Sequence, residues 1–259
     1  MLAERVLPLS GIHNFRDYGG YDVDGGGKLR RGVLWRSAHH VDASGDDLAA
    51  IDALGIETVV DLRGDDEREV HRCRRSDNFS ARVLFAGGIT AGLAPHLQAA
   101  VGAIDVETAR ARMIDTYAGM PYRPALVATL RLYLSALAEY DAPSLVHCVA
   151  GKDRTGFAVA IVHRLLGVHE DDLMQDYLLT NSAGKIEERI KQGASHIRAH
   201  YGADMDEDAI RALMSVNPAF LDAALTTVRR DHGDVATYAE AVLNLTPAMR
   251  EAMIDRLVI

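Results

Sequence analysis

The sequence His147-Cys148-Val149-Ala150-Gly151-Lys152-Asp153-Arg154-Thr155-Gly156 joins two apolar runs. Residues 143–146 before it have the composition of a short buried strand, and residues 157–166 after it have the length and apolar content of a buried helix. The stretch is therefore predicted to be a strand-to-helix turn. Such a turn directs backbone N–H groups and the positive end of the helix dipole at one point, which favours anion binding.

Cys148 and Arg154 make this predicted anion site more specific for phosphate. Five residues separate them, so the loop can curl around a tetrahedral oxyanion with the sulfur beneath it and the guanidinium beside it. The planar guanidinium can hold two phosphate oxygens at once. A helix N-terminus and nearby cations also favour the thiolate form of a cysteine. The stretch thus combines a phosphate cradle with a nucleophile.

This combination resembles the phosphate loop of the cysteine-dependent protein tyrosine and dual-specificity phosphatases. Its His-Cys-x-x-Gly-Lys-x-Arg form is similar to that of members that also accept phosphoinositides. Three further motifs resemble a bacterial branch of the family with a mycobacterial member: Asn14-Phe15-Arg16-Asp17, Asp61-Leu62-Arg63 and Asp176-Tyr177-Leu178-Leu179-Thr180-Asn181. The residues predict an α/β fold with crossover helices, and the resemblance implies a central, mainly parallel sheet flanked by helices.

The resemblance implies a protein tyrosine phosphatase that hydrolyses phosphomonoesters, with phosphoserine, phosphothreonine and phosphoinositides as further expected substrates. The Cys148 thiolate would attack phosphorus in line, and water would hydrolyse the resulting phosphocysteine. Arg154 and the loop N–H groups would hold the equatorial oxygens of the transition state. The expected substrate-binding residues of the loop are Val149, Ala150, Gly151, Lys152, Thr155 and Gly156.

Three residues of the loop have more specific expected roles. Thr155 either donates its hydroxyl to the cysteine sulfur or caps the following helix. His147 is expected to orient the loop by hydrogen bonding. The resemblance implies that Lys152 helps to bind substrates with extra phosphates.

The acid that protonates the leaving oxygen is left open between Asp153 and Asp61. Many tyrosine phosphatases carry this acid in a Trp-Pro-Asp loop, but the sole tryptophan, Trp35, is followed by Arg and Ser. Asp153 lies inside the phosphate loop and Asp61 at the expected carboxyl end of a strand, and the resemblance offers precedent for both positions. An aspartate that accepts loop N–H groups or pairs with an arginine would be a poor acid.

Four residues far from the loop are expected to support it. The resemblance places Asn14, Arg16 and Asp17 beside the loop, whereas a hairpin in which Arg16 and Asp17 pair is the alternative. Arg36 either brings a second cation to the site or forms a structural ion pair.

The composition indicates one globular domain over residues 1–259. With 48% hydrophobic and 25% charged residues the chain can form a sizeable core. The net charge of −9 argues against nucleic acid as a partner, and no apolar run is long enough to span a membrane. No cofactor is expected, and no metal, because His39-His40 lacks partners at ligand spacing. The sequence does not indicate an oligomeric state.

The two cysteines, Cys73 and Cys148, are too few for a disulfide framework and indicate a reducing compartment. A secretory signal is not recognisable, so a cytoplasmic location is expected, while the resemblance leaves export without a cleavable signal open. Residues 65–75 are predicted to be a solvated charged segment. Cys73 within it is predicted to be a surface thiol and not a disulfide partner that protects Cys148.

Periodicity and turn residues predict the other elements. Strands are expected at 32–36, 56–62 and 83–85, and helices at 46–54, 105–120, 124–139, 170–180, 184–200, 206–215, 217–230, 235–243 and 246–257. The helical C-terminal region either caps the sheet or covers the site as a lid, for which residues 181–220 are the candidate.

Three other functions fit parts of the pattern. A pseudophosphatase would hold a phosphorylated partner in the same loop without turnover. A sulfur-transfer enzyme of the rhodanese kind also has a cysteine in an anion-binding loop, but the spacing to Arg154 and the following Thr-Gly favour phosphate. A Cys-His protease is disfavoured because no separate His-Asn pair is recognisable.

Overall fold

A mixed sheet forms the centre of the computed structural model, which describes residues 2–88, 105–191 and 205–259. Within these ranges the sheet has five strands in the order β1-β2-β5-β3-β4. They are β1 (Arg16–Asp17), β2 (Leu34–Ser37), β3 (Thr58–Asp61), β4 (Arg82–Leu84) and β5 (Ser144–His147). β1 pairs with β2 antiparallel, and the other three pairings are parallel. The expected mainly parallel α/β sheet is confirmed.

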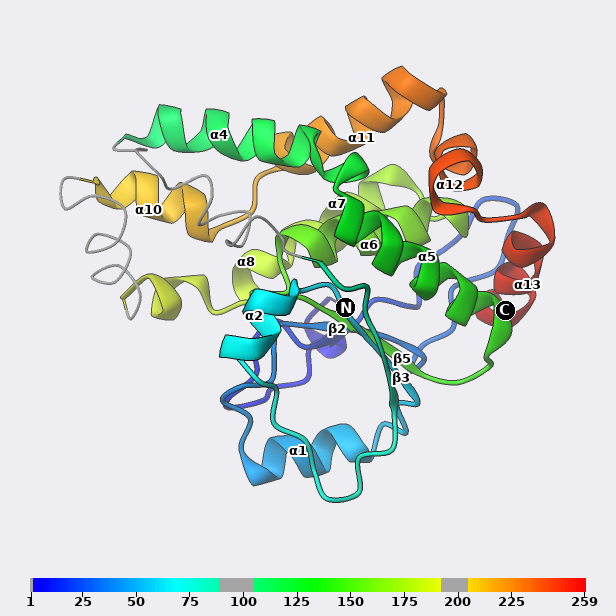
Figure 1. The fold of residues 1–259 in the computed structure, drawn as a ribbon, viewed down its shortest axis with the longest axis horizontal. Helices are drawn as coiled ribbons and strands as arrows, with labels where there is room; N and C mark the ends of the chain where they lie inside the picture. The colour runs from blue at the N-terminus through cyan, green and yellow to red at the C-terminus, as the bar shows by residue number, and fades with distance from the viewer. Residues whose placement is uncertain (1, 89–104, 192–204) are drawn as a thin grey trace.

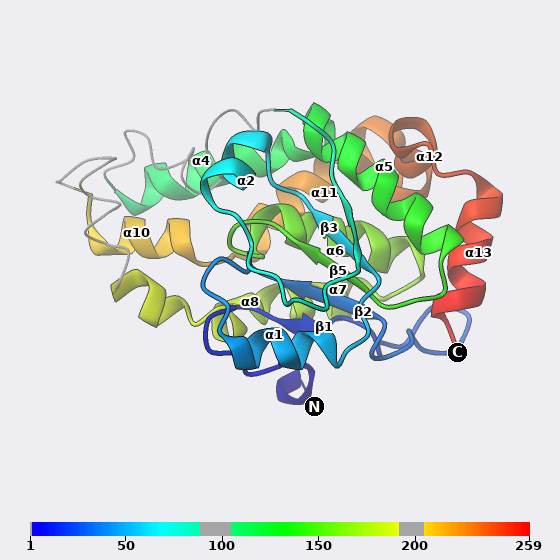
Figure 2. The same ribbon diagram turned by 60° about the horizontal axis from the view of Figure 1, so that its bottom comes forward.

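The helices of the described residues flank this sheet, as Figures 1 and 2 show. They are η1 (Leu2–Arg5), α1 (Gly45–Asp52), α2 (Asp65–Val70), α4 (Val106–Ala118), η2 (Met120–Tyr122), α5 (Pro124–Glu139), α6 (Asp153–Leu165), α7 (Glu170–Leu178), α8 (Thr180–Ala183), α10 (Glu207–Met214), α11 (Pro218–His232), α12 (Val235–Leu243) and α13 (Pro247–Leu257). Residues 186–191 are also helical. The predicted helix at 184–200 lies partly outside the described residues, and the other predicted helices and strands are present with small shifts in their limits.

Polar side chains start many of these helices. Ser44, Asp105, Asp206, Asp234 and Thr246 each accept a hydrogen bond from a backbone N–H of the first helical turn. These bonds satisfy donors that would otherwise lack an intrahelical partner. Local capping residues therefore determine where these helices begin, and packing of their apolar faces stabilises them.

Two apolar clusters cover the two faces of the sheet. On one face, Leu48 and Ile51 of α1 pack against a small cluster that contains Val59 and Leu145. The large cluster on the other face contains residues of α5 and α6 and extends to the C-terminal helices. There α10 and α11 pack on α4, and α13 packs on α5. The chain thus places its helical C-terminal part on the same face as α6.

The strand β5 is central and fully buried, and its last residue, His147, lies between the ends of two neighbours. Ser37 of β2 is its register partner on one side and Asp61 of β3 on the other. Open parallel sheets bind ligands at the carboxyl ends of their strands. The segments that follow β2, β3 and β5 therefore meet at this edge.

The helix α6 begins at Asp153, four residues before the predicted start at 157. The last four residues of the quoted loop form its first turn, and the Gly156 N–H already bonds to the Lys152 carbonyl at 2.8 Å. None of these four residues is apolar, so the apolar content of the sequence does not reveal this turn. Among the described residues no helix is long and apolar enough to cross a membrane.

Candidate active site

Gly151 fixes the path of the loop between β5 and α6. Its φ is +63°, and a Cβ on it would lie 2.3 Å from the carbonyl oxygen of Ser37. A side chain is therefore excluded by the close approach and disfavoured by the left-handed backbone. The Gly151 carbonyl accepts hydrogen bonds from Asn14 Nδ2 at 2.6 Å and Arg36 Nη2 at 3.0 Å.

A buried ionic triad of Asp176, Arg16 and Arg36 supports these bonds. Asp176 of α7 pairs with Arg36 of β2, Oδ2 to Nη1 at 2.6 Å, and with Arg16 of β1, Oδ1 to Nε at 3.1 Å, and all three side chains are 0% exposed. Burial alone would raise the pKa of Asp176, but the two guanidinium groups outweigh it and hold that pKa well below its usual range. Arg36 thus forms the structural ion pair and also brings its guanidinium to the Gly151 carbonyl of the loop, so the two alternatives for Arg36 occur together.

Asn14 and Arg16 belong to this support, whereas Asp17 does not. Asn14 has a φ of +61°, and its Oδ1 accepts a hydrogen bond from Arg16 Nη1. Asp17 accepts from the backbone N–H groups of Gly19 at 2.8 Å and Gly32 at 2.9 Å. Asp17 thus closes a turn, and the expectation that it supports the loop is wrong, as is a pair between Arg16 and Asp17.

Arg154 is held by a carboxylate that sequence reasoning missed. Its Nη1 and Nη2 contact Glu67 Oε2 at 2.5 Å and Oε1 at 2.8 Å, and Nη1 also donates to the Leu62 carbonyl at 3.1 Å. Burial would lower the pKa of Arg154, but the bonds to Glu67 raise it above its usual range. The buried Nε of Arg154 has no hydrogen-bond partner among the described residues.

The prediction that residues 65–75 are solvated is therefore wrong at Glu67, which is 8% exposed. It lies in α2, which follows β3, and β3 is the parallel neighbour of β5. A carboxylate after Asp61-Leu62-Arg63 is thus brought to the same edge as the loop. The need of a buried arginine for a counter-charge was the signal that could have identified it.

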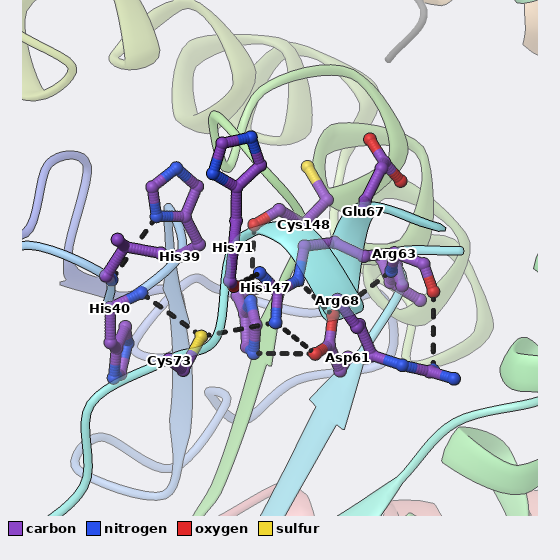
Figure 3. Close-up of polar contacts among 12 residues, drawn as sticks. His39, His40, Asp61, Arg63, Glu67, Arg68, His71, Cys73, His147 and Cys148 are labelled. Carbon is purple, nitrogen blue, oxygen red and sulfur yellow. Dashed lines mark hydrogen bonds and ion pairs between the residues drawn. The ribbon is translucent and has the colours of Figure 1, made fainter. Parts of the chain in front are cut away.

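Both carboxylate oxygens of Asp61 bond to the guanidinium of Arg63, as Figure 3 shows. Arg63 Nε lies 2.8 Å from Oδ1, Nη2 lies 2.7 Å from Oδ2, and the Arg63 N–H also donates to Oδ1. Burial would raise the pKa of Asp61, but the His147 ring and the Arg63 guanidinium lower it well below its usual range. A carboxylate held in this way is poorly suited to donate a proton, which argues against Asp61 as the acid.

Cys73 is a free, half-buried and hydrogen-bonded thiol, so it is more enclosed than the predicted surface thiol and is not paired with Cys148. Its Sγ lies 3.3 Å from Arg63 Nη2 and 3.3 Å from the backbone N of His40. Both cysteines are free thiols in the structure.

His147 contacts the loop backbone directly. Its Nδ1 lies 3.2 Å from the carbonyl oxygen of Cys148, and its ring stacks on His40 with centroids 5.5 Å apart. Burial lowers the pKa of His147 to about 4, although Asp61 opposes this shift. The ring is therefore neutral at neutral pH and adds no charge beside the cysteine.

Cys148 lies at the carboxyl end of β5 and is 2% exposed. The following residues include Lys152, which is the N-cap of α6, so the alternative in which Thr155 caps the helix is wrong. Thr155 lies within the first turn, is 0% exposed, and its Oγ1 has no hydrogen-bond partner in the described part of the chain.

Lys152 and Asp153 connect the loop to the covering helices. Lys152 is 1% exposed, and its Nζ donates to the carbonyls of Leu213 at 2.7 Å and Ser215 at 3.2 Å. The same Nζ lies 3.1 Å from Asp153 Oδ1, which also accepts from the Tyr117 hydroxyl at 2.8 Å. Burial lowers the pKa of Lys152, and Asp153 opposes that shift.

A hollow of about 270 Å³ opens beside the loop. Its lining residues include Val149 of the loop, His39, and Arg189 and Met214 from the helical segments that follow residue 181. Val149 directly follows Cys148 in the chain, so the hollow lies next to the loop at the carboxyl edge of the sheet.

Comparisons with known proteins agree with this arrangement. The chain matches the tyrosine phosphatase family over residues 7–259. A protein of Cupriavidus necator whose name places it among the tyrosine-protein phosphatases is 31% identical over 247 residues, which cover 93% of this chain and 85% of that protein. The triple specificity protein phosphatase PtpB of Mycobacterium tuberculosis is 29% identical over 268 residues, with 92% and 93% covered.

The chain therefore belongs to the tyrosine phosphatase family, as its loop and three further motifs predicted. The expected class of enzyme, a protein-tyrosine phosphatase, is confirmed with it. A crystal structure of P. aeruginosa TpbA covers 71% of this chain and 86% of its own at 19% identity and a TM-score of 0.34. At this TM-score the likeness adds nothing to the description of the fold.

Proposed function

We propose that the protein hydrolyses phosphotyrosine and other phosphomonoesters through a phosphocysteine formed on Cys148. The observation that carries the proposal is the state of Arg154. Glu67 fixes both Nη atoms, and the buried Nε lacks an acceptor among the described residues. Buried donors in native proteins are nearly always paired, so an unpaired one beside a nucleophile indicates a ligand atom. A phosphoryl oxygen is the matching acceptor.

The proposed reaction has two steps. The Cys148 sulfur forms a bond to phosphorus as the bond to the leaving oxygen breaks, and Asp153 gives that oxygen its proton. Arg154 and the N–H groups of Val149 to Arg154 hold the three equatorial oxygens. A water molecule then attacks the phosphocysteine, Asp153 accepts its proton, and the thiolate leaves. Asp153 is preferred as the acid because Asp61 is locked to Arg63.

Activity toward phosphoserine, phosphothreonine and phosphoinositides extends the proposal. PtpB, which is named a triple specificity protein phosphatase, supports a broad substrate range. An extra phosphate would need Lys152, whose ammonium group is bound to the Leu213 and Ser215 carbonyls. We expect such substrates to compete with these carbonyls, so they should be turned over more slowly than phosphotyrosine.

Phosphate release by the reduced native protein tests the proposed function. We expect orthovanadate-sensitive release from phosphotyrosyl peptides, with lower rates for phosphoseryl peptides and phosphoinositides. Absence of release from every substrate would contradict the proposal. If phosphopeptide binds by titration without turnover, the protein is a pseudophosphatase that reads phosphate, which is the alternative function.

Residues 181–220 are proposed to act as a lid over the loop. Within their described parts, residues 186–191 and α10 supply Arg189 and Met214 to the hollow, and the carbonyls at the end of α10 hold Lys152. We expect Lys152→Met to speed amide hydrogen exchange in α10 about tenfold, because hydrogen bonds from a buried ammonium group are lost. Lys191→Met, at an exposed position, serves as the control. Equal exchange in native protein and Lys152→Met would remove the support for a lid held by Lys152.

The domain organisation and location complete the proposal. A single phosphatase domain is supported by one apolar cluster that includes Val146 of β5, Ile161 of α6 and Met253 of α13. A cytoplasmic location suits a nucleophile that must stay reduced, and export remains an alternative.

A further inference from the structure

Two buried tyrosines form a hydrogen-bonded chain that ends on Asp153. The Tyr177 hydroxyl on α7 donates to the Tyr117 oxygen at 2.8 Å, and the Tyr117 hydroxyl on α4 donates to Asp153 Oδ1 at 2.8 Å. The chain has one direction, because each hydroxyl carries a single proton and the carboxylate end accepts. The chain of hydrogen bonds thus links α7, through α4, to one oxygen of Asp153 in α6.

Packing fixes both hydroxyls in place. Tyr117 is 0% exposed, and its ring centroid lies 5.8 Å from that of Phe220 and 6.4 Å from that of Tyr177. A Cβ on Gly156 would lie 2.9 Å from the ring of Tyr177, so this ring rests directly on the first turn of α6. Burial and the charge of Asp153 raise the pKa of Tyr117 well above its usual range, which keeps it a proton donor.

The charged groups around Asp153 are cations from several elements. Lys152 contacts Oδ1 at 3.1 Å, and Arg154 follows Asp153 in α6. Arg123, which precedes α5, and Arg189 of the helical segment 186–191 also interact with Asp153, and the Cys148 sulfur interacts with Lys152, Arg154 and Arg189. The arginines act through charge and Lys152 also donates a hydrogen bond to Asp153, whereas Tyr117 is a neutral donor that can fix the direction of the carboxyl group.

We propose that Tyr117 is a positioning residue that anchors Asp153 Oδ1, so that the carboxyl group is aimed at the leaving oxygen. The inference rests on the proposed role of Asp153 as the acid. Proton transfer matters most when the leaving oxygen is strongly basic, as in phenyl or alkyl phosphates, and least for p-nitrophenyl phosphate. Tyr117 should therefore act mainly on substrates that need the acid.

The variant Tyr117→Phe tests this inference because it removes the hydroxyl and keeps the ring. We expect kcat for phenyl phosphate to fall about tenfold and kcat for p-nitrophenyl phosphate to fall by no more than about twofold. A donor to a carboxylate stabilises its ionised form, so loss of this hydroxyl should move the basic limb of the pH profile up by about 1–2 pH units. Tyr177→Phe should change the two kcat values and the basic limb in the same directions, by smaller amounts.

The matched control is Tyr133→Phe on α5. Tyr133 is also 0% exposed and also loses a tyrosine partner, because its hydroxyl bonds to that of Tyr18. This control should leave the ratio of the two kcat values and the basic limb unchanged. If Tyr117→Phe and Tyr177→Phe slow both substrates equally with an unmoved basic limb, the hydroxyls have a structural role and the inference is wrong.

The outcomes separate this inference from the proposed function. Asp153→Asn should remove the basic limb, and an unchanged limb in an active protein would refute the acid role on which Tyr117 depends. Loss of the proposed function would instead appear as absent turnover in the native protein. If Tyr117→Phe does not fold, the same measurements on Tyr177→Phe test the inference. This variant removes the second hydroxyl of the chain and leaves the bond from Tyr117 to Asp153.

Discussion

Replacement of Cys148 by serine is expected to reduce phosphate release on the order of 10⁵-fold, the scale of loss when a catalytic nucleophile is removed. A serine hydroxyl remains protonated at neutral pH, and the adjacent His147 ring cannot activate it through Nδ1, because this nitrogen bonds to the Cys148 carbonyl. The loop N–H groups and Arg154 are untouched. Phosphopeptide binding should therefore persist, as measured by calorimetric titration beside single-turnover kinetics.

Cys73→Ser is the matched control, because Cys73 is the other cysteine of the chain. A serine oxygen can accept the bonds that its sulfur receives from Arg63 and the His40 N–H. We expect this variant to keep activity within about threefold of the native protein, since its hydroxyl can replace the sulfur in these contacts, whose net strength is modest. Comparable loss in both variants would contradict the assignment of the nucleophile to Cys148.

Asp176→Ala is expected to lower the free energy of unfolding by about 3–5 kcal/mol, because it leaves two buried guanidinium groups without a counter-charge. Arg16 and Arg36 are 0% exposed, so water cannot replace the lost carboxylate without rearrangement. The Arg36 bond to Gly151 depends on the same anchor, and activity should fall with stability. Urea denaturation followed by circular dichroism measures the change.

The control for Asp176 is Asp141→Ala, which removes an exposed ion pair to Arg30 with the aspartate 63% exposed. Exposed pairs contribute about 0–1 kcal/mol, so this variant should remain close to native stability. Equal destabilisation by the two changes would mean that the triad does not hold the loop.

The same triad predicts a pH dependence of stability. The folded-state pKa of Asp176 is held well below its usual range, so its contribution is fully present above the carboxyl range of an unfolded chain. The contribution is lost as the pH falls toward the depressed folded value. Asp176→Ala should accordingly show a weaker loss of stability on acidification than the native protein.

Local patterns were sufficient to predict most of the fold. The apolar run that ends in His147 and the helix after it follow from composition, and the helical spacing of apolar residues predicted the helices at 46–54 and 124–139. The start of α6 was missed because its first turn consists of Asp153, Arg154, Thr155 and Gly156, whose polarity resembles a loop. Periodicity detects buried faces and not the polar turn of a buried helix.

The catalytic residues were predictable where they are adjacent in sequence, whereas the support from Asn14 and Arg16 followed from the family resemblance. Cys148 and Arg154 lie in one loop, and their spacing carries chemical meaning. Glu67, Tyr117 and Tyr177 reach the site through tertiary packing, which no local pattern encodes. The choice between Asp61 and Asp153 likewise required the bonds from Arg63, because both aspartates occupy acceptable positions in the sequence.

The central claim is that a phosphoryl group passes through Cys148. Rapid alkaline quench during turnover of a phosphotyrosyl peptide, followed by proteolysis at mildly alkaline pH and mass spectrometry, measures it directly, because S–P and N–P bonds are labile in acid. We predict that the peptide containing Cys148 gains the mass of one phosphoryl group on the cysteine, and that Cys148→Ser shows no such product. Turnover with an unmodified cysteine, or a phosphoryl group on His147 instead, would contradict the account.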